Sequence, residues 1–257
     1  MITSDSRLRL LTFAINSELR EAAFNHGYQC DTGVADGWLW FCSGTAPGEI
    51  ALAASESYWF LAVTHPGVAA ELEGERAEPV PGAAAAAFAF SSQSEMRAAL
   101  SRAWHLARSL PSAPLQWFEA EVAALGETEV ERMVRQRIGQ DVFRAALMDY
   151  WGGRCPLTGI DDPALLRASH IIPWSECTSD AERLDVHNGL LLSSLWDAAF
   201  DNGLISFDNE GVALFSPRLS STAREALAAE AVPRLPLKKG QHERLNWHRT
   251  YLFAREC

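Results

Sequence analysis

The sequence has few of the features that mark secreted, membrane-spanning or zinc-ribbon proteins. Its five cysteines are spread over 257 residues and form no C-x-x-C pair, which excludes a zinc ribbon and a thioredoxin-like motif. No apolar run approaches the roughly 18 residues that a bilayer span requires, and no basic segment precedes an apolar one near the N-terminus. We therefore expect reduced thiols, no membrane contact and a cytoplasmic location.

Positive charge is also scarce. The chain has 22 basic and 33 acidic side chains, a net charge of -11, and its only lysines are Lys238 and Lys239. This balance disfavours a protein that coats nucleic acid through bulk electrostatics. However, residues 1–128 carry a net charge of -8 and residues 129–257 only -3, so a local basic patch in the second half stays open.

The first half has the pattern of a small α+β unit. A composition of 48% hydrophobic and 21% charged residues excludes a disordered chain. Alternating apolar residues predict strands at 37–42 and 57–63, helical spacing predicts helices at 10–24 and 94–109, and residues 79–87 are expected to form a loop. Six aromatic residues in this half favour a packed core over a pocket that stacks a nucleobase: Tyr28, Trp38, Trp40, Tyr58, Trp59 and Phe60.

Two prolines flanked by small residues at 109–114 mark a domain boundary. Beyond it, Thr128 and Glu131 have the form of a helix capping box, and the helical spacing that follows is expected to end at Gly139 before a second helix starts at Asp141. We therefore predict an overall α+β fold of three parts: an N-terminal domain (1–113), a helical connector (114–150) and a C-terminal domain (151–257).

The residues with the most chemical interest lie between 154 and 215. His170 is placed in a strand-like segment that ends before a proline, and Asn188 precedes a glycine in a turn. A helix capped by Ser193 or Ser194 is expected to follow. Asp197 and Asp201 share one face of that helix and repel each other, so a metal ion or a basic partner is worth considering there.

Four segments in order resemble the HNH endonucleases, which have a ββα-metal domain. They are Cys155-Pro-Leu-Thr-Gly159, Ala168-Ser-His-Ile-Ile-Pro-Trp174, Asn188-Gly-Leu-Leu-Leu192 and Asp197-Ala-Ala-Phe-Asp201-Asn-Gly-Leu-Ile-Ser-Phe207. Flanking residues extend the resemblance to about 128–255, and it does not include the N-terminal half.

The resemblance implies roles for individual residues. His170 would activate water for attack on a phosphodiester, and Asn188 would hold the loop that orients it. The pattern departs from the family at Trp196, where a histidine is usual, and at Ser169, where many relatives have a metal ligand. Asp197 and Asp201 would then supply oxygen ligands, which favour Mg²⁺ or Mn²⁺ over zinc.

Arginines suit phosphate geometry, and we expect Arg144, Arg154 and Arg167 to contact the substrate. An alternative of about equal weight is that the arginines near the motif lie on a solvent-exposed helix face and do not contact the substrate. His187 is more simply an exposed residue before a turn than a ligand. The segment with Trp247, His248 and Arg249 is expected to dock a terminal helix on the core.

The function implied is a divalent-metal-dependent nuclease that hydrolyses DNA, with a bacterial restriction or defence role and modified DNA as one substrate class. The N-terminal domain would select the substrate or recruit a protein partner, and a homodimer is an open alternative. Two other functions also stay open: an inactive HNH fold that binds nucleic acid or protein, and a nuclease toxin.

Overall fold

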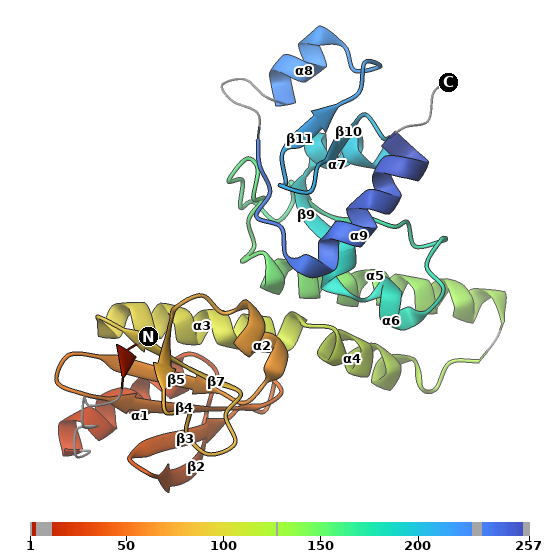
Figure 1. Cartoon of the computed structure of the whole chain (residues 1–257). Helices are drawn as coiled ribbons and strands as arrows, with labels where there is room; N and C mark the ends of the chain where they lie inside the picture. The colour runs from red at the N-terminus through yellow and green to blue at the C-terminus, as the bar shows by residue number, and fades with distance from the viewer. Residues whose placement is uncertain (1, 4–11, 127, 228–232, 254–257) are drawn as a thin grey trace. The chain divides into compact units, whose positions relative to one another are not determined.

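The computed structural model describes residues 2–3, 12–126, 128–227 and 233–253 (Figure 1). The chain divides into two compact units, Met1–Ala113 and Pro114–Cys257. Both units mix helices with strands, which confirms the α+β class. The division into an N-terminal domain, a helical connector and a C-terminal domain stays a prediction, because two compact units do not reveal the role of each part.

The first unit is built on a seven-stranded sheet of order β1-β6-β7-β5-β4-β3-β2. Its pairs are antiparallel except for β1 with β6. The elements are β1 (Ile2–Thr3), α1 (Phe13–Asn25), β2 (Cys30–Ala35), β3 (Trp38–Cys42), β4 (Glu49–Ala54), β5 (Trp59–Val63), α2 (Pro66–Glu71), β6 (Glu75–Glu78), β7 (Ala86–Phe90) and α3 (Gln93–Ser109).

Most of these elements follow the sequence pattern. The helix expected at 10–24 is α1, although residues 10 and 11 lie outside the described part of the chain. The loop expected at 79–87 was wrong in its last two residues, because β7 begins at Ala86 and pairs there with Val63 of β5. Sequence reasoning missed this because alanine has a low strand propensity, which burial in the sheet overrides.

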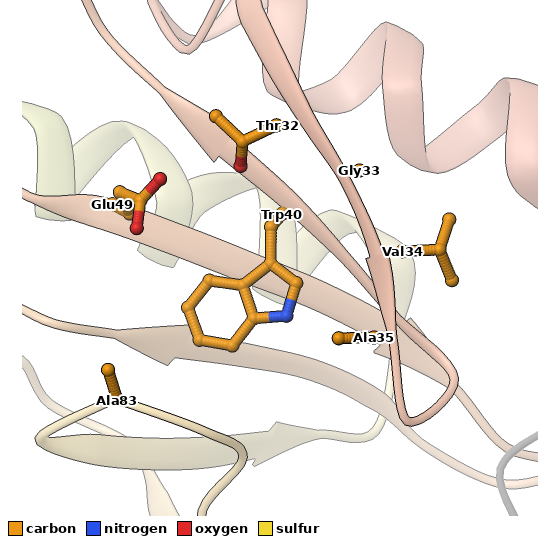
Figure 2. Close-up of a pocket in the computed structure, with 7 residues that line it drawn as sticks. All are labelled: Thr32, Gly33, Val34, Ala35, Trp40, Glu49 and Ala83. Carbon is orange, nitrogen blue, oxygen red and sulfur yellow. The ribbon is translucent and has the colours of Figure 1, made fainter.

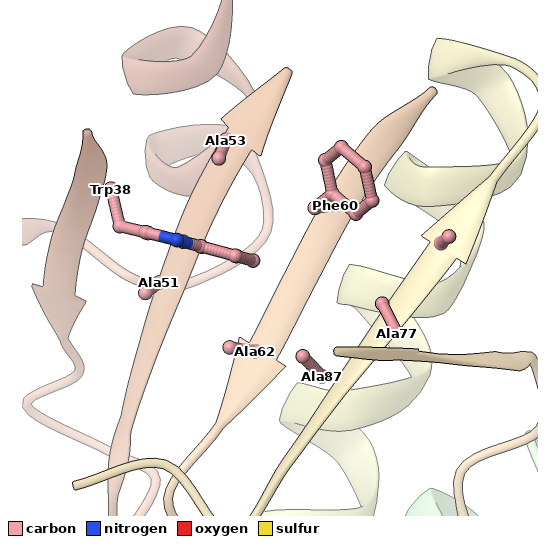
Figure 3. Packing of buried hydrophobic residues seen from close by; sticks show 8 residues of the cluster. Trp38, Ala51, Ala53, Phe60, Ala62, Ala77 and Ala87 are labelled. Carbon is pink, nitrogen blue, oxygen red and sulfur yellow. The ribbon is translucent and has the colours of Figure 1, made fainter. Parts of the chain in front are cut away.

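The two faces of this sheet bury different kinds of side chain. One row of paired positions is Leu39, Leu52, Leu61 and Phe88, all completely buried. The row beside it, on the opposite face, is Trp40, Ala51, Ala62 and Ala87. Figure 3 shows Trp38 and Phe60 standing over the alanines of this second face.

The expected aromatic core is therefore largely present. Tyr28, Trp38 and Phe60 are buried, and the Trp38 and Phe60 rings lie 6.0 Å apart. Trp40 packs against the same cluster but is only partly buried.

The second unit contains helices around two small hairpins. Its elements are α4 (Ser112–Val122), α5 (Glu129–Tyr150), β8 (Leu166–His170), α6 (Asp180–Arg183), η1 (Val186–Asn188), β9 (Gly189–Ser193), α7 (Ser194–Asp201), β10 (Ile205–Phe207), β11 (Ala213–Phe215), α8 (Ser221–Leu227), α9 (Lys239–His248) and η2 (Arg249–Phe253). α4 starts two residues before this unit does. Pro114 therefore lies in the first turn of a helix, where proline is tolerated.

A single long helix replaces the two helices expected at 128–150. Thr128 and Glu131 form the expected capping box, but α5 continues through Gly139 to Tyr150. The prediction that Gly139 ends the helix was wrong. A Cβ atom there would come within 2.5 Å of Cη2 of Trp174, so the glycine provides room for that indole.

β8, β9 and α7 together form a ββα unit. β8 and β9 are antiparallel, with His170 opposite Gly189, and α7 follows directly after β9. Ser193 is the N-cap residue of α7, but its hydroxyl makes no capping hydrogen bond. Trp196 on α7 is only 2% exposed and stacks on Phe207 of β10. Its side chain is part of the hydrophobic core between α7 and the β10–β11 hairpin.

None of the helices in the described segments has both the length and the apolar character needed to cross a bilayer.

Candidate functional site

His170 ends β8, and its two ring nitrogens have different environments. Nε2 lies 2.9 Å from the carbonyl oxygen of Arg183. A carbonyl only accepts hydrogen bonds, so Nε2 carries the proton in this contact and Nδ1 of the neutral ring keeps its lone pair. The ring also stacks on Phe143 of α5 at 3.8 Å, and Trp174 meets it edge-on at 5.6 Å. The ring orientation is fixed by contacts on several sides.

Burial lowers the pKa of His170 below its ordinary value, although the hydrogen bond to the Arg183 carbonyl acts in the opposite direction. At neutral pH the imidazole is therefore uncharged. A neutral imidazole with an available Nδ1 can accept a proton from water.

Asn188 joins the two ends of the loop between β8 and β9. It is completely buried, its Oδ1 accepts from the amide of Ile172 at 2.9 Å, and its Nδ2 donates to the carbonyl of Ile172 at 3.1 Å. Its amide group thereby satisfies both backbone groups of a residue two positions after His170. This geometry suits the loop-holding role that the sequence predicts.

Asp197 and Asp201 lie one turn apart on α7, beside Ser169. The Ser169 hydroxyl donates to Oδ1 of Asp197. Partial burial, and then the charge of Asp197, raise the pKa of Asp201 to about 6. Ser169 therefore binds one of the two carboxylates, a contact that sequence reasoning missed because it joins residues 28 positions apart.

His170 and Asp201 open into a common cavity of about 300 Å³. Trp174, His248 and Leu252 contribute to its walls. Asp197 does not line this cavity, although it lies one helical turn from Asp201, which does. The structure thus combines a candidate base and a carboxylate of raised pKa in one cavity.

The donor set around this cavity limits which metal could bind. Among the described residues there is no cluster of three or more histidine, cysteine or acidic ligands. Structural and catalytic zinc sites usually take three or four protein ligands, whereas Mg²⁺ is commonly held by one or two carboxylates with water and substrate phosphate. Asp201 and Asp197 offer carboxylate oxygens, which are ligands that would suit a divalent cation such as Mg²⁺.

His248, which also lines the cavity, is a structural residue. Its Nδ1 is 3.0 Å from the Ser206 hydroxyl, its Nε2 is 3.1 Å from the Phe200 carbonyl, and its ring stacks on Phe200. Burial lowers the pKa of His248 to about 4, so it is neutral. Both nitrogens are occupied, which excludes it as a ligand in this conformation.

A charged network not anticipated from the sequence fixes the segment before Asn188. Asp185 binds His187 through Nδ1 at 3.0 Å and forms an ion pair with Arg244 of α9. Burial alone would raise the pKa of Asp185, but the His187 hydrogen bond and the Arg244 charge lower it overall. Because Arg244 is 59 positions away, no local pattern could reveal this contact. It attaches α9 to the segment that contains Asn188.

The three arginines expected at the substrate make local contacts. Arg144 donates to the carbonyls of Leu166 and Pro163, Arg154 to Gly159 and Asp161, and Arg167 to Ala164 and Leu166. They support the segment leading into β8. A phosphate contact by their other N–H groups stays a prediction.

The family comparison agrees with this geometry. Residues 155–208 match a family model described as HNH endonuclease, which confirms the resemblance inferred from the sequence over that segment. None of the curated proteins matches the chain. The matched segment contains β8, β9, α7 and β10, and an HNH domain indicates nuclease activity.

Proposed function

We propose that the protein is a divalent-cation-dependent endonuclease that hydrolyses DNA phosphodiester bonds. One observation carries the proposal: the Arg183 carbonyl fixes the proton of His170 on Nε2, in a cavity shared with Asp201. This arrangement leaves Nδ1 as the group that removes a proton from an attacking water.

Each residue then has a defined task. His170 accepts the proton of water at Nδ1, and its lowered pKa keeps it ready to do so at neutral pH. Asn188 keeps the loop after β8 closed, so the imidazole stays in position. Asp201 and Asp197 would hold the cation, which supplies positive charge that stabilises the developing negative charge on the phosphate.

Plasmid nicking by the full-length chain with Mg²⁺ or Mn²⁺ tests this mechanism. Removing a general base costs about 10²- to 10⁴-fold in rate, so His170→Ala is expected to lower nicking by that factor. His242→Ala is the matched control, because His242 does not line the cavity, and it is expected to nick like the wild type. Equal nicking by the wild type and His170→Ala would exclude His170 as the base.

A second candidate function is a binding module with an inactive HNH fold. It is favoured by the absence of a three-ligand cluster among the described residues and by the Ser169 hydrogen bond that already engages Asp197. This function predicts DNA binding without nicking by the wild type under any divalent cation. A toxin role has no specific structural observation in its favour.

We also propose a role in bacterial restriction or defence, in which the first unit selects the substrate or recruits a partner. Support comes from the HNH match being confined to the second unit, so the first unit is available for selection. Cleavage of the same DNA, unmodified and carrying methylated or hydroxymethylated cytosine, tests the selection. Equal cleavage of all three substrates would reject modified DNA as the preferred class.

A further inference from the structure

The first unit has a cavity of its own, of about 330 Å³, centred on Trp40 (Figure 2). Its lining comes from β2 (Thr32, Gly33, Val34, Ala35), from Glu49 of β4 and from Ala83 in the loop before β7. It is a shallow hollow that is largely open to solvent, and its volume lies at the lower end of the range of about 300 to 1,000 Å³ for small-molecule sites, which suits a ligand of one or two rings.

Small residues leave the indole of Trp40 accessible. Its partner on β2 is Gly33, and a Cβ atom on Gly33 would meet nothing within 4 Å. Its partner on β4 is Ala51, one of the small residues of the alanine-rich face. Trp38, two residues away on the same face, is buried, whereas Trp40 is only partly buried. A flat ring can therefore stack against Trp40.

The cavity has few polar groups, and they suit a ligand that donates hydrogen bonds. Glu49 is the single charged residue among those lining it, and Thr32 adds a hydroxyl. This combination of one aromatic plane with a carboxylate and a hydroxyl matches the edge and face of a nucleobase.

The lining of the cavity argues against phosphate as the feature recognised, because its one charged residue is the acidic Glu49. Residues 1–113 contain 7 basic and 12 acidic side chains. Contact with a phosphate backbone depends on lysine and arginine, whereas stacking on an aromatic ring does not. We therefore favour a nucleic-acid ligand whose base occupies the cavity over one that is bound through its sugar-phosphate backbone.

We infer that this cavity binds a single nucleobase, stacked on Trp40, with an amino or imino N–H donated to the carboxylate of Glu49. The inference rests on the proposed function for the choice of nucleic acid as the ligand, and it identifies where the first unit would read its substrate. A base must leave the duplex, or be in a single strand, to enter such a cavity.

Fluorine NMR of the full-length His170→Ala chain, labelled with 5-fluorotryptophan, gives a local test. Trp40→Phe identifies the Trp40 resonance. The probes are deoxycytidine, 5-methyldeoxycytidine, deoxyadenosine and thymidine, which have no phosphate for the arginines of the second unit to bind.

Saturable movement of the Trp40 resonance with at least one nucleoside, while that of Trp104 stays unchanged, would support the inference. Glu49→Gln is then expected to weaken binding about tenfold, since it removes a charge-assisted hydrogen bond. No movement up to the solubility limit, unchanged affinity in Glu49→Gln, or movement with acetylarginine amide alone would overturn it. The last result would identify a basic peptide as the occupant.

These outcomes are separable from those of the nuclease proposal. The binding measurement uses a variant without the proposed base and no added metal, so an inactive nuclease would leave it readable. Conversely, a wild type that nicks DNA but whose Trp40 does not respond would reject this inference alone.

Discussion

At the scale of single residues, the two ring nitrogens of His170 differ in role. Nε2 fixes the orientation of the ring, and Nδ1 is the nitrogen that can accept a proton. The Arg183 carbonyl holds Nε2, and the stacked Phe143 prevents rotation of the ring. Histidine can take either tautomer in solution, and only a neighbouring acceptor selects one. The residue type could be predicted from the sequence, but the tautomer depends on a carbonyl 13 positions away.

Asp197 provides the first residue-scale prediction. Asp197→Asn removes one of the two carboxylates on α7 while keeping a hydrogen-bond acceptor for Ser169. We expect metal affinity and nicking to fall together by about tenfold or more, with an unchanged unfolding midpoint. Calorimetric Mn²⁺ titration and plasmid nicking measure the two quantities. An unaltered Mn²⁺ titration would assign the ligand to another residue, and Asn202→Ala, next to Asp201 but exposed, is the control.

His248 provides a prediction about pH. Its pKa falls from 6.5 in the unfolded chain to about 4 in the fold, so the unfolded state binds more protons between these values. The contribution of His248 to the free energy of unfolding therefore has its full value above pH 6.5. It decreases by about 3 kcal/mol as the pH falls towards 4.

Urea unfolding at pH 7, 6 and 5 measures the effect. His248→Gln, which cannot titrate, is expected to be less stable at pH 7 but to lose less stability on acidification. A parallel pH dependence in both chains would show that His248 does not cause the loss.

At the scale of elements, α5 packs against the β8–β9 hairpin and supports the candidate site. Phe143 contacts His170, and a Cβ on Gly189 at the start of β9 would come within 2.5 Å of Phe143. Gly139, one helical turn earlier, gives room to Trp174, which also meets His170. The helix and the loop therefore fix the imidazole together.

Gly139→Ala tests this support. Alanine favours a helix interior by about 1 kcal/mol over glycine, so a gain in stability would be expected from propensity alone. Because the new methyl group would collide with Trp174, we expect instead a loss of stability and a fall in nicking of about tenfold. Gln140→Ala, an exposed position on the same helix, is the control and should change neither quantity. Retained activity with higher stability would show that Trp174 does not position His170.

At the scale of the whole molecule, the basic side chains are divided unevenly between the two units. Residues 1–113 carry 7 basic and 12 acidic side chains, whereas residues 114–257 carry 15 basic and 21 acidic ones, so the second unit has about twice as many basic groups at a similar net charge. A bound divalent cation would add further positive charge beside Asp201. We therefore expect phosphate contacts to come from the second unit alone.

The salt dependence of DNA binding tests this division. For the His170→Ala chain, Arg154→Gln is expected to weaken binding to all sequences alike and to reduce the slope of log affinity against log salt by about 1. Arg20→Gln in the first unit, where Arg20 pairs with Asp31, is the matched control and should leave the slope unchanged. A lower slope for Arg20→Gln would place phosphate contacts in the first unit.

Local features of the sequence determined the α+β class, the capping box at Thr128, the helix at 94–109 and the ββα order around His170, Asn188 and Asp197. These depend on periodicity, caps and short motifs, which act over a few residues. Only the tertiary structure decided that α5 runs through Gly139, that Ser169 binds Asp197, and that Arg244 binds Asp185. Such contacts join residues far apart in the chain, and their energies depend on burial and neighbouring charge, which exist only once the chain has folded.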